Sequence, residues 1–415
     1  MVSRNRKKFY LICILGLLTA VGPFSIDMYL PAFPDIARTL NTNVSEVMLS
    51  LSSFFVGIAA GQLIYGPLLE RFGRKRPLYF GLSIYIASSV ACAMATSVEA
   101  LILFRLLQAL GGCAGMVAAR AIVRDLFEVK ENAKIFSLLM LVVAVSPIIA
   151  PTAGGYVTAA LSWRYVFFIL LLMGVVILLG VHFILPESKK PDPHFSLKPQ
   201  AIFKTFFAII KHPQFYTYTL TGAVAYGGLT AYISGSPHAF MELFRVSEKQ
   251  YGWIFALVAV GIISASQINN LALRKFSSSQ ILKAASLCQS IVGIMLVSFV
   301  VLQWSTLYVV IVFIFLFLGC HGFIFPNASA LSLASFGHVA GSASALMGAI
   351  QMGLGAGVSA LVSVFQNDTL LPMAGAMASC AVLAFSFLTF GRKMILQQAS
   401  KEGVQEEDVD LVSTL

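Results

Sequence analysis

Charged residues are scarce in this sequence: Asp, Glu, Lys and Arg make up only 11% of its 415 residues, whereas hydrophobic residues make up 58%. A water-soluble protein of this composition would expose too much apolar surface to stay in solution. Apolar runs of about 20 residues recur along the chain, and each is long enough to cross a hydrocarbon core roughly 30 Å thick. The sequence therefore predicts a membrane protein with many spans.

Signatures of catalysis and metal binding are also missing. The chain has no GxxxxGK[ST], HExxH or GxSxG motif, which argues against a nucleotide-driven motor and against a hydrolase. Its six cysteines all lie in apolar runs without CxxC spacing, which favours helix packing over disulfides or metal ligation. We expect no enzymatic activity, no bound metal and no organic cofactor.

Positive charge is distributed unevenly along the chain. Twelve spans are expected, at 9–30, 45–66, 78–96, 99–121, 134–158, 163–185, 214–236, 251–272, 281–302, 306–326, 341–364 and 371–391. Of the 28 Lys and Arg residues, 22 fall at the termini, in the even-numbered connections or at the span ends that adjoin them. Four fall in the odd-numbered connections or at their adjoining span ends, and two, Arg105 and Arg120, fall in the interior of a span. By the positive-inside rule both termini are cytoplasmic. The net charge of +10 thus reflects membrane topology rather than nucleic-acid binding.

The two halves of the chain repeat weakly. Ser45-Glu46 at the second span is matched by Ser247-Glu248 at the eighth, and Gly155 by Gly357 at the same offset. Duplicated six-helix halves are typical of transporters that bind their substrate between the halves near mid-membrane. We expect an all-α protein with two pseudo-symmetric six-helix bundles. Its parts are the first bundle (1–185), a cytoplasmic linker (186–212), the second bundle (213–392) and an acidic cytoplasmic tail (393–415).

The segment "GPLLERFGRKRP" (66–77) follows the second span and is the most specific motif. It resembles the loop G-x-x-x-D-R-x-G-R-[KR] of major facilitator transporters, with Glu70 at the position of the usual Asp. The resemblance implies ionic contacts that hold the cytoplasmic side closed; the alternative is a basic loop that only sets topology. The candidate gate residues are Gly66, Glu70, Arg71, Gly73, Arg74, Arg124 and Asp125.

The fourth span contains an arginine, Arg105, which is costly in an apolar interior unless it is paired or faces a cavity. Gln108 lies three residues later on the same helix face. The stretch resembles the family motif R-x-x-Q-G-x-G, with Ala109 at the first glycine position, and the resemblance implies a role in proton coupling. A purely structural ion pair is the alternative. Arg120 lies 15 residues further on, about 22 Å along the helix.

The fifth span contains "SPIIAPTAGGY" (146–156). Prolines in a membrane helix bend it and free backbone carbonyls, and glycines allow close packing. The stretch resembles the family's antiporter motif G-x-x-x-G-P-x-x-G-G, which implies an exporter; an ordinary kinked helix is the alternative. The motif residues are Pro147, Pro151, Gly154 and Gly155.

Asp27, in "SIDMYLPAFP" (25–34), is the only acidic residue expected in the interior of a span, since every other Asp or Glu falls in a connection, at a span boundary or in a tail. It lies at a depth similar to that of Arg105, so we expect the two to pair and Asp27 to take up a proton that weakens the pair. Apolar and aromatic residues at this level suit a moderately apolar substrate. The candidate substrate-contacting residues are Phe24, Tyr29, Gln108, Arg120, Tyr226 and Tyr232.

The whole chain, notably "FRLLQALGG" and "LSWRYVFFI", is similar to the bicyclomycin-resistance (Bcr/CflA) branch of bacterial drug:proton antiporters. The resemblance implies a monomeric multi-pass protein of the bacterial inner membrane that exports antibiotics, such as bicyclomycin- or phenicol-type compounds, in exchange for protons. Its expected partners are a small-molecule substrate, protons and the lipid bilayer, without nucleic acid. The alternatives are an exporter or proton symporter of a native metabolite (a siderophore or nucleoside), and a non-transporting receptor or scaffold.

Overall fold

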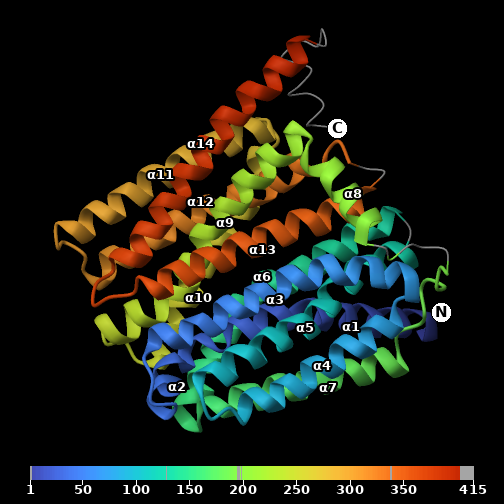
Figure 1. The fold of residues 1–415 in the computed structure, drawn as a ribbon, viewed down its shortest axis with the longest axis horizontal. Coiled ribbons are helices and arrows are strands. Elements are labelled where there is room, and N and C mark those ends of the chain that lie inside the picture. Colours follow the sequence, from blue (N-terminus) through green and yellow to red (C-terminus); the bar gives the residue numbers. More distant parts are fainter. Residues whose placement is uncertain (1, 128, 194–196, 198, 337–338, 402–415) are drawn as a thin grey trace. The chain divides into compact units, whose positions relative to one another are not determined.

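The computed structural model describes residues 2–127, 129–193, 197, 199–336 and 339–401. All regular elements among these residues are helices (Figure 1). Twelve of the helices have 19 or more residues, which at 1.5 Å per residue gives about 28 Å or more, close to the thickness of a bilayer core. The predicted all-α architecture with twelve long helices is confirmed.

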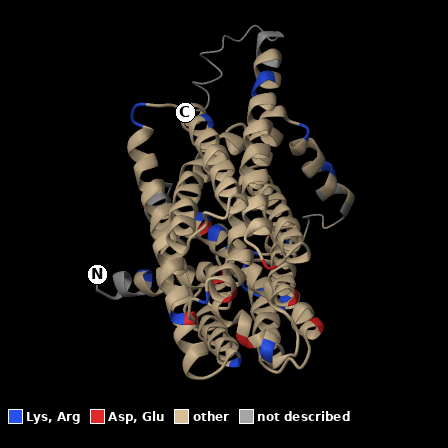
Figure 2. Cartoon of the chain, turned by 90° about the vertical axis from the view of Figure 1, so that its left-hand side faces the viewer, with Lys and Arg blue, Asp and Glu red and all other residues tan. Residues whose placement is uncertain are grey.

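Ten of the described helices are long and apolar enough to cross a membrane, and long stretches of them carry no charged residue (Figure 2). The two further helices of similar length are α4 (Lys75–Ala93) and α9 (Pro213–Pro237). Helix α9 packs against α12, α13 and α14, so most of its surface is buried in protein. Its Thr221 and Ser234 hydroxyls donate to carbonyls four residues earlier. Burial in protein rather than lipid explains its lower hydropathy.

The chain forms two compact units. The first comprises the residues up to Lys198 together with Val246–Ala256, and the second comprises Pro199–Arg245 and the residues from Leu257 onward. The linker expected at 186–212 is thus divided between the two units. Besides α4, the first unit contains α1 (Val2–Asp27), a 3₁₀ turn (Leu30–Ala32), α2 (Phe33–Thr39), α3 (Val44–Phe72), α5 (Val98–Leu126), α6 (Val129–Ala160) and α7 (Trp163–Phe183).

The second unit is built around α9. Its other elements are α8 (Pro199–Ile210), a π-helical segment (His238–Leu243), most of α10 (Glu248–Ala272), α11 (Ser278–Val301), α12 (Leu307–Leu333), α13 (Ala340–Val364) and α14 (Leu371–Lys401). Helices α11 and α12 pack together, and α14 contacts both α9 and α11. The first turns of α10 belong to the first unit.

Helix α5 is the centre of the first unit, where α3 and α4 approach it closely. A Cβ atom on Gly57 of α3 would lie 2.6 Å from the Cβ of Ala109 in α5. A Cβ on Gly111 of α5 would lie 2.5 Å from the backbone nitrogen of Tyr85 in α4. Small residues permit such approach of helices in membranes. This packing encloses the polar side chains that α5 carries on the same turns.

Helix α1 ends before the expected end of the first span at residue 30. Its last residue is Asp27, and the chain then forms the 3₁₀ turn before α2 begins. Pro31 has no amide hydrogen for a helical hydrogen bond, which favours a break at this point. The break leaves carbonyl groups of the last turn of α1 without helical partners.

Candidate functional site

Arg105 of α5 has no exposed surface. Its Nη1 donates to Oε1 of Gln108 at 2.7 Å, and its Nη2 donates to the backbone carbonyl oxygen of Ser25 at 2.9 Å. The guanidinium carbon lies 4.1 Å from the ring centroid of Phe54 and 4.5 Å from that of Tyr29. Hydrogen bonds and cation–π contacts therefore stabilise a charge that is costly within a membrane.

The acceptors around Arg105 are themselves held in place. The Nε2 of Gln108 donates to the hydroxyl of Ser89 at 2.8 Å, which orients the amide oxygen toward Arg105. The carbonyl of Ser25 is available because α1 ends two residues later. The hydroxyl of Ser25 lies 2.8 Å from that of Tyr85. Helices α1, α4 and α5 are thus joined through one polar network, which we call the Arg105 network.

Asp27 lies beside this network but does not belong to it. Asp27 is only 5% exposed, and no hydrogen bond or ion pair joins it to another described residue. The predicted ion pair between Asp27 and Arg105 is therefore not formed. Arg105 instead donates to the backbone carbonyl of Ser25 and to the amide oxygen of Gln108.

Charged side chains join the turn between α3 and α4 to the end of α5. Arg74 is 2% exposed; its Nε donates to Oδ2 of Asp125 at 2.7 Å, and its Nη1 donates to Oε1 of Glu70 at 3.1 Å. Glu70 also pairs with Lys189. Burial by itself lowers the pKa of Arg74, but the hydrogen bond with Asp125 and the charge of Glu70 raise that pKa above its ordinary value. The structure thus brings together Glu70, Arg74 and Asp125, all predicted gate residues.

Gly73 and Glu187 complete this turn. Gly73 has a φ of +79°, in the left-handed region that glycine adopts without strain. Glu187 follows α7, and its carboxylate accepts the backbone N–H groups of Arg74 at 2.7 Å and Lys75 at 3.1 Å. A carboxylate at this position caps α4 and interacts favourably with its dipole. Glu187 is not among the predicted gate residues, because its only signal in the sequence is one acidic residue at the start of a basic segment.

Replacing Glu187 by Ala is expected to lower the free energy of unfolding by about 1 kcal/mol, because α4 loses its only N-terminal side-chain cap among the described residues. Denaturation of the purified protein in mixed micelles measures the change. Lys190→Ala, an exposed change three residues away, should leave stability unaltered. Equal effects of the two substitutions would contradict the capping role.

The other three gate residues lie apart from these ion pairs. The Nη1 of Arg71 donates to the backbone carbonyl of Asp192 at 3.2 Å. Arg124 is exposed and forms no ion pair with another described residue. A Cβ atom on Gly66 would meet no atom within 4 Å, so this glycine is not required for close packing here.

Helix α6 continues as one helix through both of its prolines. Its paired glycines make the closest contacts. A Cβ on Gly154 would lie 2.1 Å from the carbonyl oxygen of Met28, and a Cβ on Gly155 would lie 2.4 Å from that of Glu248. Both neighbours are backbone atoms, so neither can move aside as a side chain would. The motif residues thus pack α6 against the chain that follows α1 and against the start of α10.

Replacing Gly154 by Ala is expected to destabilise the protein by about 1–3 kcal/mol, because the added methyl group requires backbone movement. Gly66→Ala is the matched substitution, since it adds the same group to open space and should not destabilise the fold. Thermal unfolding in detergent compares the two variants. A Gly154→Ala protein as stable as Gly66→Ala would refute the contact.

The remaining predicted residues occupy different environments. Tyr29 and Tyr232, expected to contact substrate, are buried among protein side chains. Phe24 and Tyr226 are half-buried. Arg120 is half-buried, and no hydrogen bond or ion pair links it to another residue in the described part of the chain.

A model of the Major Facilitator Superfamily matches residues 15–360. The chain belongs to this superfamily. It is therefore a transporter rather than an enzyme, in agreement with its ten described helices that are long and apolar enough to cross a membrane. Within the described ranges, no group of three or more His, Cys, Asp or Glu side chains is arranged to hold a metal ion.

Relatives within the superfamily match over most of their length. An MFS-type transporter of Bacillus subtilis, YdgK, is 34% identical over 93% of this chain and 96% of its own. A bicyclomycin resistance protein homolog of Haemophilus influenzae is 30% identical over 94% of this chain and 98% of its own. The crystal structure of a D-xylose-proton symporter has a TM-score of 0.72 at 14% identity, covers 92% of this chain and 97% of its own, and supports the fold alone.

Proposed function

We propose that this superfamily member is a proton-driven exporter of small, moderately apolar compounds, antibiotics among them. The observation that carries the proposal is the burial of two ionisable side chains: Asp27 at the end of α1, and Arg105 of α5, which contacts the same turn of α1. Arg105 is held by neutral acceptors and aromatic rings, whereas Asp27 is buried without a described partner. A scaffold has no use for a second buried charge that nothing compensates.

Asp27 is the proposed proton carrier. An unpaired carboxylate is costly to keep charged in a buried site, so proton binding removes that cost. Arg105 is the proposed positioning residue, because its bond to the Ser25 carbonyl links α5 to the same turn of α1. A proton on Asp27 changes the charge of that turn and so changes which arrangement of α1 is favoured.

The charged cluster of Glu70, Arg74 and Asp125 is the proposed cytoplasmic gate. The distribution of Lys and Arg supports a cytoplasmic position for this cluster and for both termini. The bacterial inner membrane is the proposed location, by likeness to bacterial relatives. A buried arginine that binds two carboxylates is stable only while both remain in place. Movement of the turn that carries Arg74 away from the end of α5 breaks the cluster, so the cluster favours the closed state.

The proposed direction of transport and the proposed cargo are inferred from similarity to other transporters. The α6 motif resembles that of antiporters, and the Haemophilus influenzae relative bears a drug-resistance name. No metal or organic cofactor has a part in this proposal, and the proton is the coupling ion. The protein is proposed to act as a monomer.

Everted membrane vesicles from a pump-deficient bacterium that expresses the chain test the proposal. Respiration acidifies the vesicle interior, and a pH-sensitive dye reports that acidification. Addition of a bicyclomycin-type or phenicol-type compound is expected to release protons from vesicles that contain the chain, but not from vesicles that lack it. Uptake of a native compound with protons would move the dye signal without any response to drugs, and would overturn the export proposal.

A further inference from the structure

Helix α8 carries large apolar side chains on one face, although its 12 residues are too few to cross a membrane. Phe203, Phe207 and Ile210 are spaced at i, i+4 and i+7, which places them on one side of the helix. They are 68%, 60% and 39% exposed. The helix ends only two residues before α9 begins, so it lies where the chain enters the membrane.

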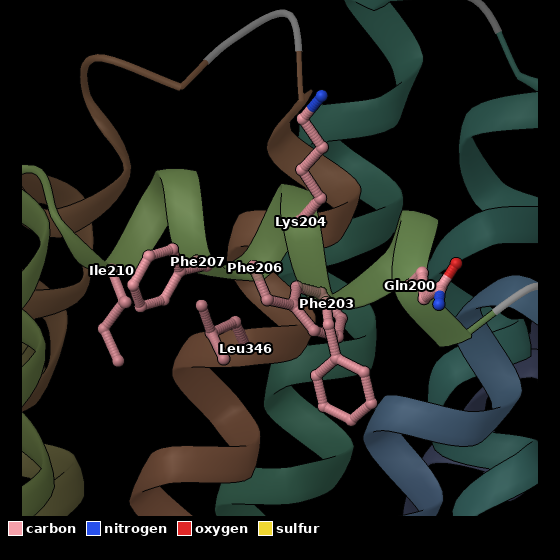
Figure 3. Close-up of a pocket in the computed structure, with 7 residues that line it drawn as sticks. All are labelled: Gln200, Phe203, Lys204, Phe206, Phe207, Ile210 and Leu346. Atoms are coloured by element: carbon pink, nitrogen blue, oxygen red, sulfur yellow. The ribbon is translucent and has the colours of Figure 1, made fainter.

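This apolar face borders a pocket of about 560 Å³ between α8 and Leu346 of α13, which we call the α8–α13 pocket (Figure 3). Phe206 completes its aromatic wall, and Gln200 is the only uncharged polar residue in the lining. Leu346 lies six residues from the start of α13, about 9 Å along that helix. The pocket is therefore close to the end of a membrane span.

Two lysines of the α8 region lie at the α8–α13 pocket. The amino group of Lys204 points away from the ring of Phe203 (Figure 3). The Nζ of Lys211 lies 4.3 Å from the ring centroid of Phe207. The sequence from residue 193 to residue 241 contains no acidic residue. Lysines at a membrane surface extend their amino groups toward anionic headgroups while their stems stay on apolar surface.

We propose that the α8–α13 pocket binds an anionic phospholipid of the cytoplasmic leaflet, with an acyl chain along the phenylalanines and the phosphate at Lys204 and Lys211. An apolar wall without converging hydrogen-bond groups suits a hydrocarbon chain, whereas a polar ligand needs such groups for orientation. The proposal rests on the membrane orientation used in the proposed function, which makes residues 186–212 cytoplasmic, but on neither the cargo nor proton coupling.

Native mass spectrometry of the full-length protein, loaded with defined mixtures of phosphatidylglycerol and phosphatidylcholine, tests the site. Wild-type protein is expected to retain phosphatidylglycerol in preference to phosphatidylcholine. Each lysine near a membrane surface contributes a factor of about five in affinity for anionic lipid, so Lys204→Gln with Lys211→Gln should reduce the preference by about twentyfold or more. Phe203→Ser with Phe207→Ser should lower retention of both lipids.

Lys275→Gln with Lys283→Gln is the matched control, since it removes two exposed lysines near the start of α11. It should leave the preference unchanged. The proposal is overturned if the control and the α8 variant lose the preference equally, or if the α8 lysine variant retains phosphatidylglycerol like the wild type. Bound lipid is measured without substrate or gradient, so failure of the export proposal would not change this result.

Discussion

Asp27→Asn is expected to reduce proton-driven export to the level of vesicles that lack the protein, because the amide cannot carry the coupling proton. The side chain keeps its size in the same buried site, so substrate affinity should change by less than about tenfold, or 1.4 kcal/mol. Dye-detected proton release measures export, and equilibrium binding of a labelled substrate to detergent-solubilised protein measures affinity.

The control is Glu99→Gln, which removes one negative charge from the exposed start of α5. Its transport should equal that of the wild type. Transport by Asp27→Asn that still follows the pH gradient would assign the proton to another residue. Loss of folded protein would be a separate outcome, and thermal unfolding of the same preparation distinguishes it.

Arg105→Ala is expected to lower the free energy of unfolding by about 3–5 kcal/mol, the usual effect of removing one member of a buried charged network. Gln108 and the Ser25 carbonyl would lose their donor, and the rings of Tyr29 and Phe54 would border a void. Arg105→Lys keeps the charge, but one ammonium group does not reproduce the planar fork that reaches both acceptors while stacked on the rings. We expect the Arg105→Lys protein to fold, but its transport should be poor.

Arg38→Ala is the comparison for Arg105→Ala. The Arg38 side chain is 72% exposed and pairs with Asp35 at 3.8 Å, so its loss should change stability by less than about 1 kcal/mol. Unfolding in mixed micelles and drug-dependent proton release are measured for all three variants. Full transport by Arg105→Lys would show that charge alone is sufficient and would contradict the positioning role.

Contacts along one helix were predictable from the sequence. Arg105 and Gln108 are three residues apart, and helical geometry places them together whatever surrounds the helix. The long helices followed from apolar runs for the same reason. The contact between Arg74 and Asp125 followed from the expected topology, because both spans end on the same side of the membrane.

Contacts that depend on where a helix ends, or on a segment far away in the sequence, were not predictable. The predicted bond between Asp27 and Arg105 failed because a similar depth in the membrane does not determine which groups meet, and Arg105 donates to Gln108 and to the Ser25 carbonyl at the end of α1. The burial of Tyr232 depends on α9 being surrounded by α12, α13 and α14, which no local pattern encodes. The role of Glu187 depends on the path of the chain after α7.

That path has a consequence for biosynthesis. Glu187 is 113 residues downstream of Arg74, and at a synthesis rate of about 5–20 residues per second it follows roughly 6–23 s later. Until then the amino end of α4 has no cap, and Glu70 lacks Lys189. Helix α4 therefore enters the membrane before the residues that stabilise its start have been translated. The assembly of the first bundle can finish only after the ribosome has passed residue 189.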